Sequence, residues 1–266
     1  MPYKAEILLD SVNQFDNRLT TFLVQYPRFV HSEHLRHRIM SFSVSSSRAI
    51  PNKKLLDAIK NDPVYPVFWG KNQPGMSAEK EIEDIDSANK IWIQARDSVI
   101  KYTEELSKLG VHKQIINRLL EPWMFVTVIV SATEWDNFFY LRCAKDAQPE
   151  IKKIADMMKE IYDKNEPKYI KYDSWHLPLT TEEDGTIWDR RKISAARCAR
   201  ASYLTMNERH DIISDINLFD KLVSSKHFSP LEHVASSASD KRYGNFFGWR
   251  QLRKSFKDEH HGRKLE

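Results

Sequence analysis

The feature that most constrains the fold is one strand-like run set among segments of helical periodicity. The run MFVTVIV at 124–130 is apolar and rich in β-branched residues, a pattern that favours a buried β-strand. Apolar residues recur near helical spacing over 77–110, and Pro149 opens another amphipathic segment. Strands and helices together in one chain predict an α/β (α+β) fold, with a mixed β-sheet flanked by helices.

Local signals predict where several of these elements begin and end. Ser77 is a candidate N-cap for the long helix, and Gly110 is a candidate C-terminal stop. Further helices are expected over 132–144 and 208–225. The short apolar runs of 5–30 predict a strand followed by a turn.

Length and composition favour a single domain. A chain of 266 residues with 41% hydrophobic residues can bury a substantial core, and only 7 glycines argue against repeats or low complexity. We expect one domain over 1–266. It divides into a core at 1–163, a polar connection at 164–192 and a second segment at 193–266.

Charge and cysteine content restrict the classes of function. The chain has 41 basic and 37 acidic residues, and its net charge of +4 indicates a mixed, solvated surface, so no nucleic-acid partner is expected. No apolar run approaches the ~18–20 residues of a membrane span, and residues 1–17 lack the apolar stretch of a signal peptide. Cys143 and Cys198 have no metal or redox spacing, which favours a reducing cytoplasm.

The segment 31–48, HSEHLRHRIMSFSVSSSR, concentrates the polar chemistry. Its three histidines, His31, His34 and His37, could ligate a metal, although no cysteine or paired carboxylate accompanies them. A basic surface loop is a second interpretation. The third is an anion site, in which arginines donate to phosphate and small serines let backbone N–H groups approach. The residue types favour the anion site.

The same segment carries a family resemblance. Arg36-His37-Arg38, followed after seven residues by Ser46, resembles the signature of the flavin-dependent thymidylate synthases. Arg118, in the run NRLLEP, is similar to the arginine of that family's Arg-x-x-x-Pro element, which contacts the nucleotide phosphate.

Further segments agree with this resemblance. In ATEWDNFFYLR, Asn137 precedes Arg142 by five residues, as in the family's helix that carries a key arginine. HFSPLEH at 227–233 resembles the flavin-contacting His-x-[Ser/Thr]-Pro-x-Glu-His element, and ARASY at 199–203 resembles the element that precedes it. NFFGWRQLRK at 245–254 is similar to an aromatic and basic segment of longer members, found in phages and some bacteria.

The order of these elements departs from the family. In its commonest members the ARxSY and His-x-Thr-Pro-x-Glu-His elements precede Arg-His-Arg, whereas here they follow it. Such a rearrangement is acceptable when chain ends lie close together at the surface. It predicts that residues 36–38 and 227–232 meet around one flavin, across the subunits of a homotetramer.

The resemblance implies reductive methylation of dUMP to dTMP in the cytoplasm of a bacterium or a phage-infected cell. Methylenetetrahydrofolate is the implied carbon donor, and FAD reduced by NADPH is the implied hydride donor. The implied catalytic residue is Arg142, which bonds the uracil edge, and no metal is implied. The implied dUMP-binding residues are Glu33, Ser46, Ser47, Arg48, Arg118 and Arg142. The implied FAD-binding residues are Arg36, His37, Arg38, Asn137, Ser202, His227, Ser229 and Glu232.

Nucleophilic catalysis is the alternative for three side chains. Ser46 could attack a substrate, but no base accompanies it, so a phosphate ligand is favoured. Cys143 and Cys198 also lack a neighbouring His/Asp arrangement and are interpreted as small buried hydrophobic residues.

Three departures from the family pattern keep other functions open. Val44 replaces a polar, often acidic residue, Glu33 stands where many relatives have glutamine, and Asp146 where some have histidine. A pyrimidine-nucleotide hydroxymethylase or an inactive relative is therefore an alternative. A basic nucleic-acid-binding module at 242–257 is another. The loop WGKNQPGM at 69–76 predicts a tight turn, with a folate, nucleotide or subunit contact as the alternative.

Overall fold

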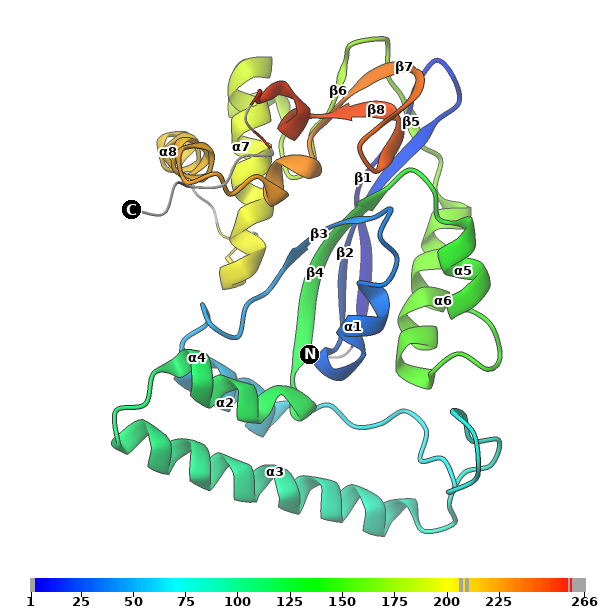
Figure 1. Cartoon of the computed structure of the whole chain (residues 1–266), viewed down its shortest axis with the longest axis vertical. Helices are drawn as coiled ribbons and strands as arrows, with labels where there is room; N and C mark the ends of the chain where they lie inside the picture. The colour runs from blue at the N-terminus through cyan, green and yellow to red at the C-terminus, as the bar shows by residue number, and fades with distance from the viewer. Residues whose placement is uncertain (1–2, 206–207, 209–210, 258, 260–266) are drawn as a thin grey trace.

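Two β-sheets form the frame of the protein (Figure 1). The computed structural model describes residues 3–205, 208, 211–257 and 259. The larger sheet has the strand order β3-β4-β2-β1-β5, and only the β1–β5 pair is parallel. The smaller sheet has the order β6-β7-β8. The strands are β1 (Lys4–Val12), β2 (Arg18–Pro27), β3 (Ser41–Val44), β4 (Phe125–Ala132), β5 (Lys168–Tyr169), β6 (Trp175–His176), β7 (Ala235–Tyr243) and β8 (Phe246–Gln251).

Helices surround the larger sheet, which confirms the predicted fold class. Helices α5 and α6 cover one face, α7 and α8 lie with the smaller sheet on the other side, and α2, α3 and α4 lie at one end (Figure 1). The helices are α1 (His31–His34), α2 (Asn52–Asn61), α3 (Ile85–Lys108), α4 (Lys113–Ile116), α5 (Asp136–Arg142), α6 (Pro149–Lys164), α7 (Ile187–Ala199) and α8 (Ile212–Ser224). No helix in the described ranges is long and apolar enough to cross a membrane.

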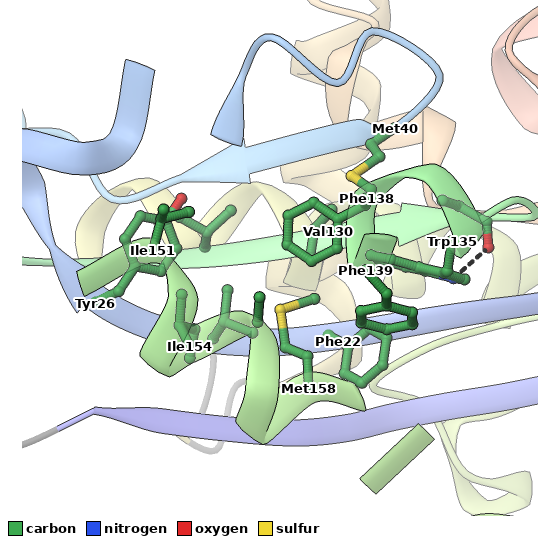
Figure 2. Close-up of a cluster of buried hydrophobic side chains, with 14 of the residues drawn as sticks. Phe22, Tyr26, Met40, Val130, Trp135, Phe138, Phe139, Ile151, Ile154 and Met158 are labelled. Atoms are coloured by element: carbon green, nitrogen blue, oxygen red, sulfur yellow. Dashed lines mark hydrogen bonds between the residues drawn. The ribbon is translucent and has the colours of Figure 1, made fainter. Parts of the chain in front are cut away.

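The period-two alternation of β2 and β4 builds the core on both faces of the sheet. Phe22 and Val130 face α5 and α6, whereas their neighbours Leu23 and Ile129 face Cys198 on α7. Figure 2 shows the first of these clusters, in which aromatic side chains of α5 meet apolar side chains of α6. Because both faces are covered, β4 is apolar almost throughout, as its sequence predicts.

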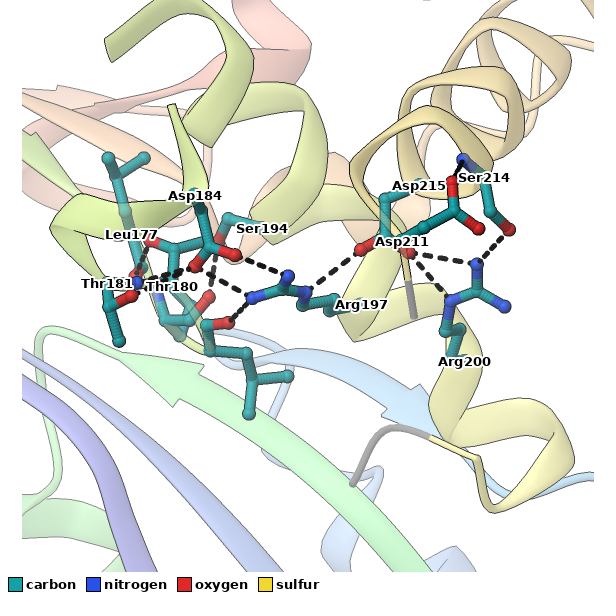
Figure 3. A network of polar contacts seen from close by, with 12 residues as sticks. Leu177, Thr180, Thr181, Asp184, Ser194, Arg197, Arg200, Asp211, Ser214 and Asp215 are labelled. Atoms are coloured by element: carbon teal, nitrogen blue, oxygen red, sulfur yellow. Dashed lines mark hydrogen bonds and ion pairs between the residues drawn. The ribbon is translucent and has the colours of Figure 1, made fainter. Parts of the chain in front are cut away.

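A polar network fixes α7 against α8 (Figure 3). The carboxylate of Asp215 is fully buried and accepts hydrogen bonds from Nε of Arg197 and Nε of Arg200, both at 2.9 Å. Arg197 also donates to Asp184 at 2.6 Å. A buried carboxylate needs such partners, because an unpaired charge in the interior is costly. The network therefore sets the position of ARASY, which begins at the last residue of α7 and contributes Arg200 to the network.

A second polar network crosses the larger sheet. His176 bonds Ser11 through Nδ1 at 2.9 Å and Thr21 through Nε2 at 2.8 Å. Thr21 bonds Ser131, which bonds Nδ1 of His233 at 2.8 Å, and Nε2 of that ring bonds Ser43 at 2.9 Å. The whole chain of hydrogen bonds is buried and joins the two sheets.

The long helix begins later than the sequence predicts. Asp84 is its N-cap and accepts the N–H of Ser87 at 2.9 Å, so the expectation for Ser77 is wrong. Residues 69–71 and 80–82 are joined by antiparallel backbone hydrogen bonds, which hold Ser77 in a loop. A good capping residue starts a helix only where the following backbone is free to coil.

Other predicted boundaries differ by smaller amounts. The segment 5–30 is a hairpin of two strands, because the side chain of Asn13 accepts two N–H groups and closes a tight turn. The helix expected over 132–144 is the shorter α5. The start of the helix expected over 208–225 includes positions outside the described residues, and its described part begins at Ile212. Helix α7 begins inside the expected connection, and the division into 1–163, 164–192 and 193–266 stays a prediction.

Candidate active site

A cleft of about 1890 Å³ opens between α1, the 66–80 loop and the junction of α5 with α6. Three of the predicted site residues, Glu33, Arg36 and Arg142, line it. Gly70 and Met76 line the opposite wall, so the loop at 69–76 faces the same space. Instead of a tight turn, the segment belongs to a longer loop that bends at 74–77 and is closed by backbone hydrogen bonds between residues 69–71 and 80–82; its contact with a ligand stays a prediction.

Arg142 is held at the wall of this cleft by three hydrogen bonds. Its Nε donates to Nε2 of His37 at 3.0 Å, and its two terminal nitrogens donate to Oε2 and the backbone oxygen of Glu33 at 3.3 and 3.2 Å. Arginine has five N–H groups, so two remain without an acceptor in the described chain. The side chain is only 18% exposed, and the three hydrogen bonds fix the orientation of the guanidinium, so the directions of its two free N–H groups are fixed as well.

Helix α5 explains how Arg142 reaches this place. Phe138 lies four residues earlier, on the same helix face, and is buried in the core. Its ring stacks on His34 at a centroid distance of 5.0 Å and meets His37 edge-on, also at 5.0 Å. The aromatic packing thus brings the end of α5 against α1 and the residues that follow it.

His37 is neutral in this arrangement. Burial, together with the positive charge of Arg142, lowers its pKa to about 4. A guanidinium only donates, so Nε2 of His37 must accept and Nδ1 must carry the ring proton. The ring therefore orients Arg142 without adding a charge beside it.

His31 and His34 are engaged by a tyrosine. The hydroxyl of Tyr26 bonds Nδ1 of His31 at 2.8 Å and Nδ1 of His34 at 2.9 Å. One hydroxyl proton serves only one ring as donor, so the two rings adopt different tautomers. Burial lowers the pKa of His31 to about 4 and that of His34 well below its usual value. No group of three or more histidine, cysteine or acidic side chains in the described chain is arranged to hold a metal ion.

A second cluster surrounds the carboxylate of Glu121. Ser47 donates its hydroxyl to Oε1 of Glu121 at 3.1 Å, and nitrogens of Arg28 and Arg118 lie 3.8 Å from the same oxygen. The amide of Asn117 donates to the backbone oxygen of Ser47 at 2.6 Å and fixes the turn. Ser47 and Arg118, two of the residues predicted to bind the dUMP phosphate, therefore lie close together, and both contact the carboxylate of Glu121.

A third cluster brings the C-terminal motif beside β3. Oε2 of Glu232 accepts the hydroxyl proton of Ser41 at 2.7 Å, and Oε1 accepts from Arg253 at 2.6 Å. Asn245 and Gln251 donate to the same serine oxygen at 2.9 and 3.0 Å. Within a single polypeptide, Glu232 is thus hydrogen-bonded to β3, the strand that follows Arg-His-Arg.

Comparison with known proteins decides the family. The family model described as thymidylate synthase complementing protein matches residues 14–168, more than half of the chain. The chain belongs to this family. The match includes Arg-His-Arg and Arg142 and ends before ARASY.

Individual relatives are distant. A flavin-dependent thymidylate synthase from Aquifex aeolicus is 26% identical over 147 residues, which cover 53% of this chain and 44% of that protein. The matched region thus spans less than half of the relative's length. A structure of the UMP/dUMP methylase PolB from Streptomyces cacaoi with 5-Br UMP has a TM-score of 0.48 at 17% identity, covering 61% of this chain and 89% of that one. The same enzyme with 5-Br dUMP gives a TM-score of 0.44 at 19% identity, covering 55% and 66%.

The other predicted residues of this family member are spread over the surface. The backbone N–H of Ser46 donates to the oxygen of Ser202 at 3.0 Å, which joins two predicted residues. The remaining predicted side chains form no hydrogen bond or ion pair with one another in the described chain. Arg38, Arg48, Asn137 and His227 are exposed, and Ser229 is half-buried. Their roles stay predictions.

Sequence reasoning missed Tyr26, Arg28 and Glu121. Tyr26 lies on a strand and has the pattern of a core aromatic residue. Glu121 lies inside the Arg-x-x-x-Pro element, where its charge beside an expected phosphate ligand was the available signal. Val44 packs against the core side chains of the larger sheet, so an apolar residue at this position has a structural reason.

The two cysteines and the basic C-terminal segment have structural roles. Cys198 is fully buried, as predicted, whereas Cys143 is only half-buried, at the edge of the core. Burial raises the pKa of the Cys198 thiol and raises that of Cys143 to about 11. Neither thiol is a thiolate near neutral pH. In the segment 242–257, Arg242 pairs with Glu134 at 2.6 Å and Arg253 pairs with Glu232. Such pairing leaves less free positive charge for a nucleic acid.

Proposed function

We propose that this chain catalyses the reductive methylation of dUMP to dTMP. Methylenetetrahydrofolate is the proposed carbon donor and FAD reduced by NADPH the proposed hydride donor. The observation that carries the proposal is Arg142, a fixed guanidinium that keeps two N–H groups free at a cleft. Membership of the thymidylate synthase complementing proteins and the flavin dependence named for the Aquifex relative support it.

Arg142 is the proposed catalytic residue. Its two free N–H groups would donate to the carbonyl edge of uracil, where negative charge develops as C5 becomes nucleophilic. A fixed donor aimed at such charge contributes about 10²–10³ in rate. Glu33 and His37 are positioning residues, since their three hydrogen bonds set the guanidinium before the substrate arrives.

The phosphate of dUMP is proposed to bind near Ser46, Ser47, Arg48 and Arg118. Arg28 and Arg118, the two arginines beside Glu121, can form charge-assisted hydrogen bonds with a phosphate. The carboxylate of Glu121 holds this position in the free protein, at 3.1 Å from Ser47 and 3.8 Å from both arginines. Phosphate binding then requires Glu121 to move away from the cluster.

The cleft offers donors that fit a flavin dinucleotide. Arg36, Lys145 and Lys153 line it and can bind phosphate oxygens. When bound, the flavin supplies the hydride that the reaction needs. Of the predicted flavin residues in the described chain, only Arg36 lines the cleft. We therefore propose that Asn137, Ser202, His227, Ser229 and Glu232 act on the flavin of another copy in a homotetramer.

The test starts from purified protein and its absorbance spectrum. We expect a yellow protein whose flavin absorbance bleaches with NADPH, and dTMP formed from dUMP and methylenetetrahydrofolate. Arg142→Ala should lower turnover by at least 10² while flavin content is retained. Protein that stays colourless after incubation with FAD contradicts the proposal. A hydroxymethylated product, identified by its mass, would support the hydroxymethylase alternative instead.

A further inference from the structure

A second cavity lies beside the amino-terminal end of α7, and it shares no lining residue with the cleft. Its volume is about 590 Å³, within the range of small-molecule sites. Two indoles and three cations line it: Trp175, Trp188, Lys168, Arg190 and Arg191. Asp173 and Glu182 are its acidic side chains, so one positive charge is in excess.

Arg191 is the unusual member of this group. It is 9% exposed, and its Cζ lies 3.4 Å from the ring centroid of Trp188 and 4.5 Å from that of Trp175. No hydrogen bond or ion pair of its guanidinium occurs within the described chain, whereas the guanidinium of Arg197, six residues later, donates four hydrogen bonds. The carboxylate of Asp173 attracts this guanidinium electrostatically but forms no hydrogen bond with it in the described chain, so its N–H groups are available to an anion in the cavity.

Arg190 adds a second unused donor. Its Nε is buried and has no hydrogen-bond partner. Two adjacent arginines with free donors, together with Lys168 in the same lining, form a cationic site of the kind that binds phosphate. Structural arginines elsewhere in the chain, such as Arg18, donate to carboxylates at ordinary distances.

Trp188 supplies a surface for a planar ring. Its side chain is 69% exposed although it lines the cavity, and an exposed indole beside phosphate-binding groups favours a stacked base. We propose that this cavity is a second nucleotide site, in which Arg190 and Arg191 bind the phosphate and the base stacks on Trp188. This site is independent of the proposed reaction at the cleft.

The experiment is calorimetric titration of the full-length protein with AMP, adenosine and inorganic phosphate as separate probes. We expect AMP to bind more tightly than either of the other two. Trp188→Ala should weaken AMP binding about tenfold or more, as loss of base stacking does, and leave inorganic phosphate unaffected. Arg190→Gln should weaken both AMP and phosphate. Tyr102→Ala, which removes a similarly exposed aromatic residue on α3, is the matched control.

Arg142→Ala separates this cavity from the cleft, because it should leave the AMP affinity of the cavity unchanged. The far-ultraviolet circular dichroism of each variant checks that it folds. AMP affinity that is the same in folded Trp188→Ala and wild type overturns the proposal. Equal affinity for phosphate and AMP would mean that the base is not recognised, and equal affinity for adenosine and AMP would mean that the phosphate is not recognised. Either result overturns the assignment of the cavity as a nucleotide site.

Discussion

Nε of Arg142 and Nε2 of His37 form a 3.0 Å hydrogen bond between residues 105 positions apart in the sequence. The histidine has to accept this bond, so its neutral form is part of the site. Glu33 completes the support of the same guanidinium through one carboxylate oxygen and one backbone oxygen. The direction of Arg142 is therefore set by three acceptors from the α1 region, of which the two side-chain acceptors, on His37 and Glu33, can be removed separately by substitution.

The first prediction concerns His37. His37→Phe removes the acceptor while keeping a ring beside Phe138, and kcat should fall about tenfold, because one charge-assisted hydrogen bond contributes about 1.5 kcal/mol or more. His37→Gln offers a carbonyl oxygen and should recover part of the rate. Steady-state kinetics with flavin content as a control measure this. Equal kcat in His37→Phe and wild type would show that Arg142 needs no support from the ring.

The second prediction concerns Glu121. Glu121→Gln should lower the KM for dUMP by about three- to tenfold, since partly exposed ion pairs contribute up to ~1 kcal/mol each and two arginines are released. Inhibition by deoxyuridine, which lacks the phosphate, should stay unchanged. The effect should shrink at high salt. A higher KM in this variant would mean that Glu121 holds the arginines in place for the phosphate.

The third prediction concerns pH. Burial lowers the pKa of His37 and His31 to about 4 and that of His176 and His233 to about 3. Below pH ~6.5, the ordinary pKa of histidine, these four side chains bind protons in the unfolded chain but stay neutral in the folded one. Their contribution to the free energy of unfolding is therefore complete above pH ~6.5 and is lost as the pH falls toward 4. The urea midpoint should be lower at pH 5 than at pH 7.5. A urea midpoint that is higher at pH 5 than at pH 7.5 would contradict this prediction.

The fourth prediction concerns the polar chain across the larger sheet. Thr21→Val leaves His176 and Ser131 each without one partner and should cost about 1–3 kcal/mol of unfolding free energy. Thr127→Val changes a half-buried residue of β4 whose side chain has no hydrogen bond among the described residues, and it should stay near wild type. Urea denaturation of the two variants compares them. A similar loss in both would assign the effect to strand packing.

Local signals predicted the elements that depend on local physics. The β-branched run of β4 and the proline that opens α6 are encoded within a few residues, and both elements form where expected. Ser77 and Asp84 are both good caps, and only the contacts of residues 69–71 with 80–82 exclude the first. That choice depends on tertiary contacts, which no local pattern contains.

The sequence predicted several residues of the candidate site, but it did not predict which of them contact each other. Arg142 and His37 were identified through a resemblance, but nothing in their spacing indicates that they contact each other. Glu121 was missed because a phosphate and a carboxylate satisfy an arginine equally well. Arg191 stacks on Trp188 three residues earlier, a spacing visible in the sequence, but the segment 164–192 was interpreted as a connection.

The contact between Ser41 and Glu232 also has a consequence for synthesis of the chain. β3 is the edge strand of the larger sheet, and its serines acquire their partners from residues 190 and 191 positions later. A ribosome makes this edge early and the segment that covers it almost last. Once β4 has paired with β3, the nascent sheet therefore presents this edge until residues 232 and 233 have been made, so closure of the edge is a late folding step.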